Sequence, residues 1–147
     1  MMTTGNLILI ENKKTYMSIP FCGDMEPESN GRFVYYLLQH LDSKGELKNA
    51  VAKLDSLKYN YAKRGFNTRI LEELDELDFA RQYNSIFGSK YLYIKNADTK
   101  NHVIVDADGK KHDIAPDEIQ VWHTGRLVCM DVSKLTLSES ETAAVRL

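Results

Sequence analysis

The chain has 147 residues, 43% of them hydrophobic and 27% charged, and a formal net charge of −2 at pH 7. We therefore expect a globular protein with a single domain, residues 1–147, large enough to bury a core. The 19 basic and 21 acidic residues nearly balance, which gives no global electrostatic case for nucleic-acid binding.

No apolar run approaches the roughly 20 residues of a transmembrane helix. No basic segment leads into a long apolar core, as it would in a secretion signal. The two cysteines, Cys22 and Cys129, lie far apart and do not form the pattern of a disulfide framework. These features predict a cytoplasmic protein with reduced thiols and no membrane partner.

The first predicted element is a β-hairpin. The runs 7–11 and 15–19 flank a polar turn, and Pro20 ends the second run. Residues 1–5, which precede the hairpin, are expected to be a flexible terminus. We expect the hairpin to join the sheet that forms later in the chain.

A helical part, residues 31–87, follows the hairpin. Apolar residues recur there every three or four positions, which predicts three helices, over residues 31–41, 43–64 and 67–87. A capping box of Ser43 and Glu46 begins the second helix. Only a few residues join the second and third helices, so these two are expected to form an antiparallel hairpin. The second helix is rich in lysine and the third carries an acidic run at 72–78, so their charges are segregated.

A strand part, residues 89–132, comes next. Short runs with alternating apolar positions are separated by turn dipeptides, of which Asp108-Gly109 is a strong hairpin signal. Four to five antiparallel strands are predicted, arranged as one antiparallel sheet or as a small SH3-like barrel.

The last stretch, residues 138–147, is polar and is predicted to be either flexible or a short helix. Ser138 and Glu141 have the spacing of a capping box. So short a helix is marginal unless it docks, and Leu135, Leu137 and Val145 are the expected contacts. The order of two strands, three helices and four to five strands predicts an α+β fold.

The chain lacks the sequence motifs of the common enzyme classes. It has no glycine-rich phosphate loop, no Cys-x-x-Cys, no His-Glu-x-x-His and no Gly-x-Ser-x-Gly. No metal site and no cofactor are therefore predicted, and binding is a better expectation than catalysis.

Three histidines of the strand part, His102, His112 and His123, are the residues suited to acid–base or metal chemistry. Two of them would meet beside an aspartate if their strands were neighbours. Their spacing is not that of a metal-ligand motif, and histidines near turns are ordinarily solvated. His123 and His112 are the catalytic candidates if the protein is an enzyme.

Aromatic side chains of the strand part are the candidate binding residues. Tyr91, Tyr93 and Trp122 are expected on one face of the sheet, with His123 and Arg126 near its rim. Aromatic residues beside lysines suit base stacking. The same side chains also suit packing against the helices, and the sequence leaves both roles open.

The leading hypothesis is a small non-enzymatic binding or regulatory protein that acts on a partner protein or a small polar ligand. Its basis is the lack of a catalytic motif, the near-neutral charge and the segregated charges of the helices. An accessory protein of a virus or mobile element has this size and composition. The alternatives are a nucleic-acid-binding module that uses the strand part, and a small His-dependent hydrolase or nuclease. The sequence does not determine the oligomeric state.

Overall fold

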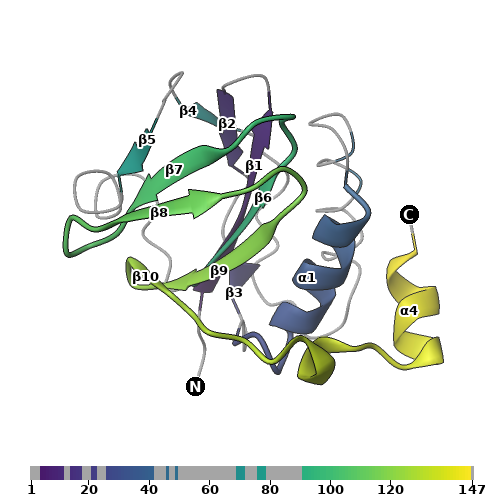
Figure 1. Ribbon diagram of the computed structural model, residues 1–147. Coiled ribbons are helices and arrows are strands. Elements are labelled where there is room, and N and C mark those ends of the chain that lie inside the picture. The colour runs from purple at the N-terminus through teal and green to yellow at the C-terminus, as the bar shows by residue number, and fades with distance from the viewer. Residues whose placement is uncertain are drawn as a thin grey trace.

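The computed structural model describes residues 4–11, 14–17, 21–22, 26–41, 46, 49, 69–71, 76–78 and 91–146. Within these residues the protein has a helical layer, a large sheet and a small sheet (Figure 1). The large sheet lies in the middle and is covered on both faces.

The large sheet has seven strands in the order β10-β9-β6-β1-β2-β4, with β3 also paired to β1. The strands are β1 (Thr4–Glu11), β2 (Lys14–Met17), β3 (Phe21–Cys22), β4 (Arg69–Leu71), β6 (Tyr91–Asn96), β9 (Ile119–His123) and β10 (Arg126–Leu127). β1 and β6 are parallel, and the other pairs are antiparallel. Leu7, Ile8, Leu9 and Ile10 of β1 are all buried, because both faces of this central strand are covered.

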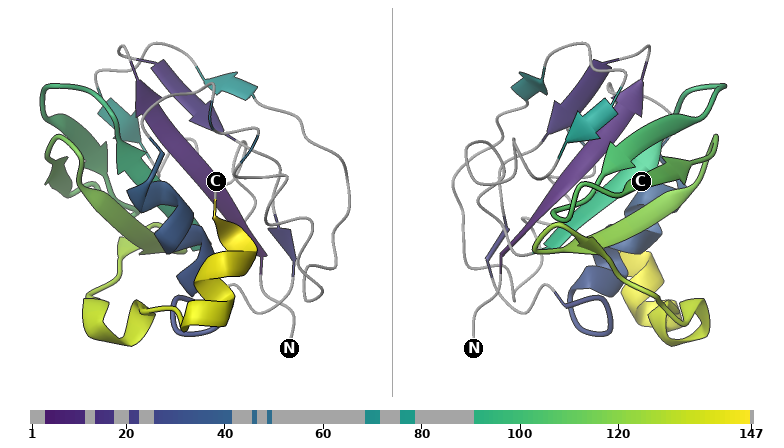
Figure 2. Two further views of the ribbon diagram at one scale, coloured as in Figure 1. Left: turned by 90° about the vertical axis from the view of Figure 1, so that its right-hand side faces the viewer. Right: turned by 60° about the vertical axis from the view of Figure 1, so that its left-hand side comes forward.

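The small sheet covers one face of the large sheet (Figure 2). It consists of β5 (Glu76–Asp78), β7 (His102–Val105) and β8 (Lys111–Ile114), with β5 and β7 parallel and β7 and β8 antiparallel. Two side chains of the large sheet donate to backbone carbonyls of β8: Asn96 to Ile114 O at 2.9 Å and Gln120 to Asp113 O at 2.9 Å. These bonds satisfy β8 carbonyls and tie the two sheets together.

The helices cover the other face of the large sheet. They are α1 (Gly31–Gln39) and α4 (Glu139–Val145), and the 3₁₀ turn η2 (Val132–Leu135) precedes α4. α1 and α4 lie side by side in the left view of Figure 2. The buried side chains of this layer come from both helices and three strands: Leu7, Leu9, Phe33, Val34, Leu37, Leu38, Leu41, Tyr93, Val121 and Val145.

The C-terminal helix α4 is held by its cap and by α1. Ser138 and Glu141 form the capping box that their spacing predicted. Leu135 and Val145 are buried, as docking of this helix required. Arg32 of α1 holds Glu141 with two hydrogen bonds, at 2.7 and 3.1 Å.

The predicted third helix, residues 67–87, is wrong. Two strands, β4 and β5, lie within this range. Thr15 of β2 pairs with Leu71 of β4, and β5 pairs with β7, so strand partners distant in sequence override the helical spacing of the leucines. No helical hairpin is therefore formed by 43–64 and 67–87. Most of the predicted second helix, 43–64, lies outside the described residues.

The predicted single antiparallel sheet or SH3-like barrel of residues 89–132 is also wrong. Its five strands are divided between two sheets, because β6, β9 and β10 join the large sheet and β7 and β8 form the small one. The N-terminal hairpin β1–β2 is present and joins the large sheet. It does so through a parallel pairing of β1 with β6, where only antiparallel strands were predicted. No helix among the described residues is long and apolar enough to cross a membrane.

Candidate functional site

Tyr93 and Trp122, two of the candidate binding residues, are completely buried. Tyr93 lies under α1, with its hydroxyl directly against Gly31, and burial raises the pKa of its phenol well above the ordinary value. Trp122 lies on the opposite face of the sheet, where its Nε1 donates to Gln120 Oε1 at 3.2 Å. Neither ring reaches the surface, so both serve the core.

Tyr91 and His123 are cross-strand partners on β6 and β9. Their rings stack, with centroids 4.5 Å apart and planes 20° apart. His123 is exposed and Tyr91 is half-buried. Partial burial, and then the negative charge of Glu26, raise the pKa of the Tyr91 phenol. The pair is thus a protonated phenol and an imidazole beside the segment that leads into α1.

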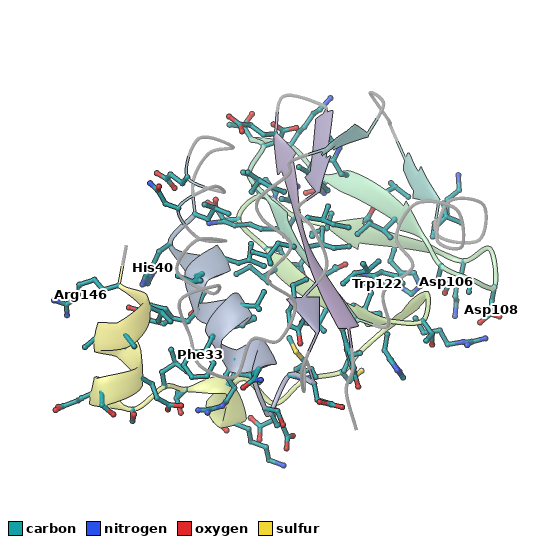
Figure 3. The ribbon with its side chains drawn as sticks, turned by 180° about the vertical axis from the view of Figure 1, so that it is seen from behind. Phe33, His40, Asp106, Asp108, Trp122 and Arg146 are labelled. Carbon is teal, nitrogen blue, oxygen red and sulfur yellow. The ribbon has the colours of Figure 1, made fainter. Side chains whose placement is uncertain are left out.

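Arg126 begins β10, where it is the cross-strand partner of His123, and its side chain is paired with Asp108. Its Nε and Nη2 donate to the two carboxylate oxygens of Asp108 at 3.3 and 3.2 Å. Both side chains are more than 60% exposed, so this ion pair contributes little to stability. Asp108 lies at the margin of the molecule (Figure 3). The five candidate residues therefore do not form one surface.

Two histidines meet aspartates rather than each other. His102 Nε2 lies 2.7 Å from Asp98 Oδ2, and His112 Nε2 lies 2.8 Å from Asp106 Oδ2. The His112 and Trp122 rings also form a T-shaped contact, with ring centroids 5.2 Å apart and planes 87° apart. Figure 3 shows Trp122 and Asp106 on the same side of the molecule. No group of three metal-ligating side chains occurs among the described residues.

Asp106 is held in its ionised form. The hydrogen bond from His112, followed by those from the Lys110 and Asp108 backbone N–H groups, lowers its pKa. Asp106 Oδ1 accepts both backbone bonds at 2.8 Å. An ionised carboxylate can only accept, so His112 Nε2 carries the proton of the shared bond. This arrangement fixes the β7–β8 turn and leaves Nε2 unavailable for acid–base chemistry on a substrate.

The turns that carry the two His–Asp pairs belong to a repeat with a period of ten residues, although the aspartates stand at different positions of it: His102 pairs with Asp98, whereas His112 pairs with Asp106, the equivalent of Asn96. Residues 94–102 and 104–112 read IKNADTKNH and IVDADGKKH. Each copy contains a strand end, an Asn or Asp whose side chain accepts the N–H two residues later, and a histidine at the first or second residue of the next strand. Comparison of the chain with itself at this spacing would have predicted the two turns.

A cleft of about 360 Å³ lies between the segment before α1 and the segment after β10. η2 borders the N-terminal half of α1 on this side (Figure 1). Nine residues line the cleft: Glu26, Pro27, Glu28, Ser29, Val128, Cys129, Met130, Asp131 and Leu135. The two walls are about a hundred residues apart in sequence, which is why residue patterns did not predict the cleft.

Arg32 joins the two walls of the cleft. Its Nε donates to Ser29 O at 3.2 Å on one side, and its Nη1 donates to Thr136 O at 3.2 Å on the other. The same guanidinium holds Glu141 of α4. Because the guanidinium is planar and rigid, these bonds set the relative position of the walls and of α4.

The lining of the cleft combines an apolar floor with an acidic rim. Val128, Met130 and Leu135 are apolar and at least half-buried, and Val128 and Met130 pack against the core of the helical layer. Glu26, Glu28 and Asp131 supply carboxylates, and none of the described lining residues is basic. Lys134 approaches Glu28 only to 3.9 Å, with both side chains largely exposed. The cleft therefore suits a ligand that is apolar in its centre and positively charged around it.

No family model, curated protein or solved structure matches this chain. The class of protein is accordingly defined by its own geometry. It is an α+β protein in which a helical layer and a small sheet cover a seven-stranded sheet, with one acidic-rimmed cleft at the N-terminal end of α1.

Proposed function

We propose that the protein is a non-enzymatic binding protein and that the cleft holds a segment of a partner protein in which an apolar side chain is flanked by Lys or Arg. The observation that carries this proposal is the apolar floor of Val128, Met130 and Leu135 inside a rim of carboxylates. Interfaces commonly have this organisation, with an apolar centre and a polar rim.

The size of the cleft limits what it holds. A volume of about 360 Å³ takes one or two side chains, so the cleft would be the anchor point of a larger contact. Full burial of one leucine-sized side chain contributes about 1.5–3 kcal/mol. Met130 supports this role because a flexible thioether adapts to side chains of different shape.

The charge of the rim determines which partners are favoured. Three carboxylates, those of Glu26, Glu28 and Asp131, attract Lys and Arg and repel the phosphates of nucleic acid. Burial of Tyr93 also removes one of the rings on which base stacking would depend. A protein partner with a basic segment is therefore a better match than a nucleic acid.

Peptide binding tests this proposal. Three sets of peptides of equal length carry a central leucine flanked by lysine, glutamate or serine, and binding is measured by fluorescence anisotropy. We expect the lysine-flanked set to bind most tightly, and added salt to weaken that binding. Equal binding by all three sets, or binding by none, would contradict the proposal.

A substitution that reverses one charge of the rim tests whether the peptide binds in the cleft. Glu28→Lys changes an exposed rim residue and is expected to weaken binding of the lysine-flanked set about tenfold, which corresponds to about 1.4 kcal/mol. The matched control is Asp113→Lys, which makes the same charge change at an exposed position of β8. Equal losses in the two variants would show a nonspecific charge effect and reject the cleft as the site.

A further inference from the structure

A second cavity lies at the other end of α1. It measures about 580 Å³ and is lined by Tyr35, Gln39, Lys95, Asp117, Glu118 and Ile119. Unlike the cleft, it is lined mainly by polar and charged side chains. It shares no lining residue with the cleft, and it plays no part in the proposed protein binding.

Lys95 is the unusual residue of this cavity, because it is a lysine with only 3% of its surface exposed. Its strand position puts it on the same face of β6 as Tyr93, which is the face covered by α1. Register places Leu9 of β1 on one side of it and Ile119 of β9 on the other. Removing an ammonium group from water is costly, so a lysine at this position requires a charged or strongly polar partner.

Asp117, on the rim of the cavity, has a left-handed backbone with φ of 63°. This conformation is unfavourable for most residues other than glycine, and aspartate is among the few that adopt it as single residues. The turn holds it there: Asp117 N donates to Asn96 O at 2.8 Å, and Asn96 N donates to Glu118 O at 3.1 Å. The end of β6 thus holds Asp117 at the cavity that Lys95, a residue of β6, also lines.

The carboxylates of Glu118 and Asp117 differ in their hydrogen bonding and exposure. Its Oε1 accepts the backbone N–H of Ala115 at 2.8 Å, so part of its carboxylate serves the turn. Asp117 is exposed. The cavity therefore combines one buried cation, an exposed carboxylate and the hydrogen-bonding groups of Tyr35 and Gln39.

We propose that this cavity binds a small zwitterion of the α-amino-acid class. Lys95 takes the ligand carboxylate and Asp117 takes its ammonium group, while Tyr35 and Gln39 lie on the α1 side, where they meet the ligand side chain. Lys95 is also engaged within the fold, but an ammonium group has three donors and can share them with a ligand. The negative end of α1 lies on this side of the molecule and favours the ligand ammonium.

Calorimetric titration with each of the standard amino acids, one at a time, tests the proposal. We expect millimolar or tighter binding of at least one of them. Its N-acetyl derivative, which lacks the ammonium, and its methyl ester, which lacks the carboxylate, should each bind at least about tenfold more weakly. Absence of binding by every amino acid, or binding of either derivative as tightly as the unmodified amino acid, would overturn the proposal.

Two variants distinguish a loss of ligand binding from a loss of structure. Lys95→Met removes the buried charge and keeps the length of the side chain, and Asp117→Gly removes the carboxylate and relieves the left-handed backbone. Both should abolish amino-acid binding. The melting temperature should stay equal or rise in Asp117→Gly and should fall in Lys95→Met, because the interaction of Lys95 within the fold is lost. The control is Lys100→Met, at an exposed lysine of the next turn, which should bind normally.

Binding that survives in Lys95→Met or in Asp117→Gly would place the ligand elsewhere and reject the cavity. Loss of binding in Lys100→Met equal to that in Lys95→Met would do the same. Glu28→Lys, in the cleft, should leave amino-acid binding unchanged, so this inference and the proposed protein binding are tested independently.

Discussion

Gly31 is the residue that allows α1 to lie close to the large sheet. A Cβ at this position would collide with Tyr93 Oη and would lie 2.7 Å from the backbone oxygen of Glu26. Both neighbours are held, since Tyr93 is fully buried and Glu26 O accepts from the backbone N–H groups of Ser29 and Gly31 at 3.0 Å. The first residue of α1 thus determines how near the segment before it approaches β6, and this segment forms one wall of the cleft.

We predict that Gly31→Ala lowers the free energy of unfolding by about 1–3 kcal/mol, because the added methyl overpacks a closed contact. Urea denaturation measures this change. The control is Gly109→Ala, where a Cβ has open space and only the positive φ of 81° opposes the substitution. A second substitution, Tyr93→Phe, removes the colliding hydroxyl and should recover part of the loss in Gly31→Ala. Full additivity of the two changes would contradict the close contact.

At the scale of elements, α4 is attached to α1 by one charged group as well as by apolar packing. The hydrogen bonds from Arg32 and from Ser138 lower the pKa of Glu141 from 4.5 to about 2. A carboxyl whose folded pKa is depressed stabilises the fold above its unfolded pKa and loses that effect as pH falls. The attachment of α4 is therefore at full strength above about pH 5 and weakens between pH 4.5 and about 2.

We predict that Glu141→Gln costs about 1–3 kcal/mol near pH 7, because it breaks a charge-assisted pair that is only partly exposed. The difference from the unsubstituted protein should shrink as pH falls toward 2. Chemical denaturation at several pH values measures both effects, and amide hydrogen exchange in residues 139–145 locates them. A difference that stays constant over this pH range would contradict the assigned role of the carboxylate.

The two copies of the ten-residue repeat carry different groups at their third position, an amide in Asn96 and a carboxylate in Asp106. Asn96 Nδ2 donates to the carbonyl oxygens of Lys100 and Ile114, both at 2.9 Å, whereas Asp106 Oδ1 accepts from backbone N–H groups. The amide is required at the first position because two carbonyls face it. The carboxylate is suited to the second because two N–H groups and His112 face it.

We predict that Asn96→Asp destabilises the protein by about 2 kcal/mol or more at pH 7, because it buries a carboxylate against two carbonyls. The loss should be smaller at acidic pH, where the new carboxyl is protonated. Thermal unfolding at both pH values checks this, with Asn96→Ala as the variant that has no charge. Equal stability of Asn96→Asp at the two pH values would contradict the claim that the carbonyls of Lys100 and Ile114 require an amide at position 96.

At the scale of the whole molecule, local signals in the sequence predicted local structure. The turn at 12–14 predicted the β1–β2 hairpin, and Ser138 and Glu141 predicted the cap of α4. The helical spacing of Ile70, Leu74 and Leu77 predicted a helix instead of β4 and β5, because the partners of these short strands are far away in the chain. Local periodicity carries no information about such partners.

The same contrast between local signals and distant partners holds for the candidate site. Strand register brings Tyr91, His123 and Arg126 together, and their role in binding stays a prediction. The alternation of Tyr91 and Tyr93 defined a face of β6, but it could not tell that α1 covers this face at Tyr93. The cleft is formed by residues 26–29 and 128–135, none of which belongs to a motif. Such a site is visible only after the chain is folded.

The most direct test of the central claim is an NMR titration of the labelled protein with a lysine-flanked leucine peptide. We predict chemical-shift changes centred on residues 26–29 and 128–135, smaller changes in α4 through Arg32, and none in the exposed residues of the small sheet. Changes centred on the small sheet, or changes spread evenly over the surface, would contradict binding in the cleft.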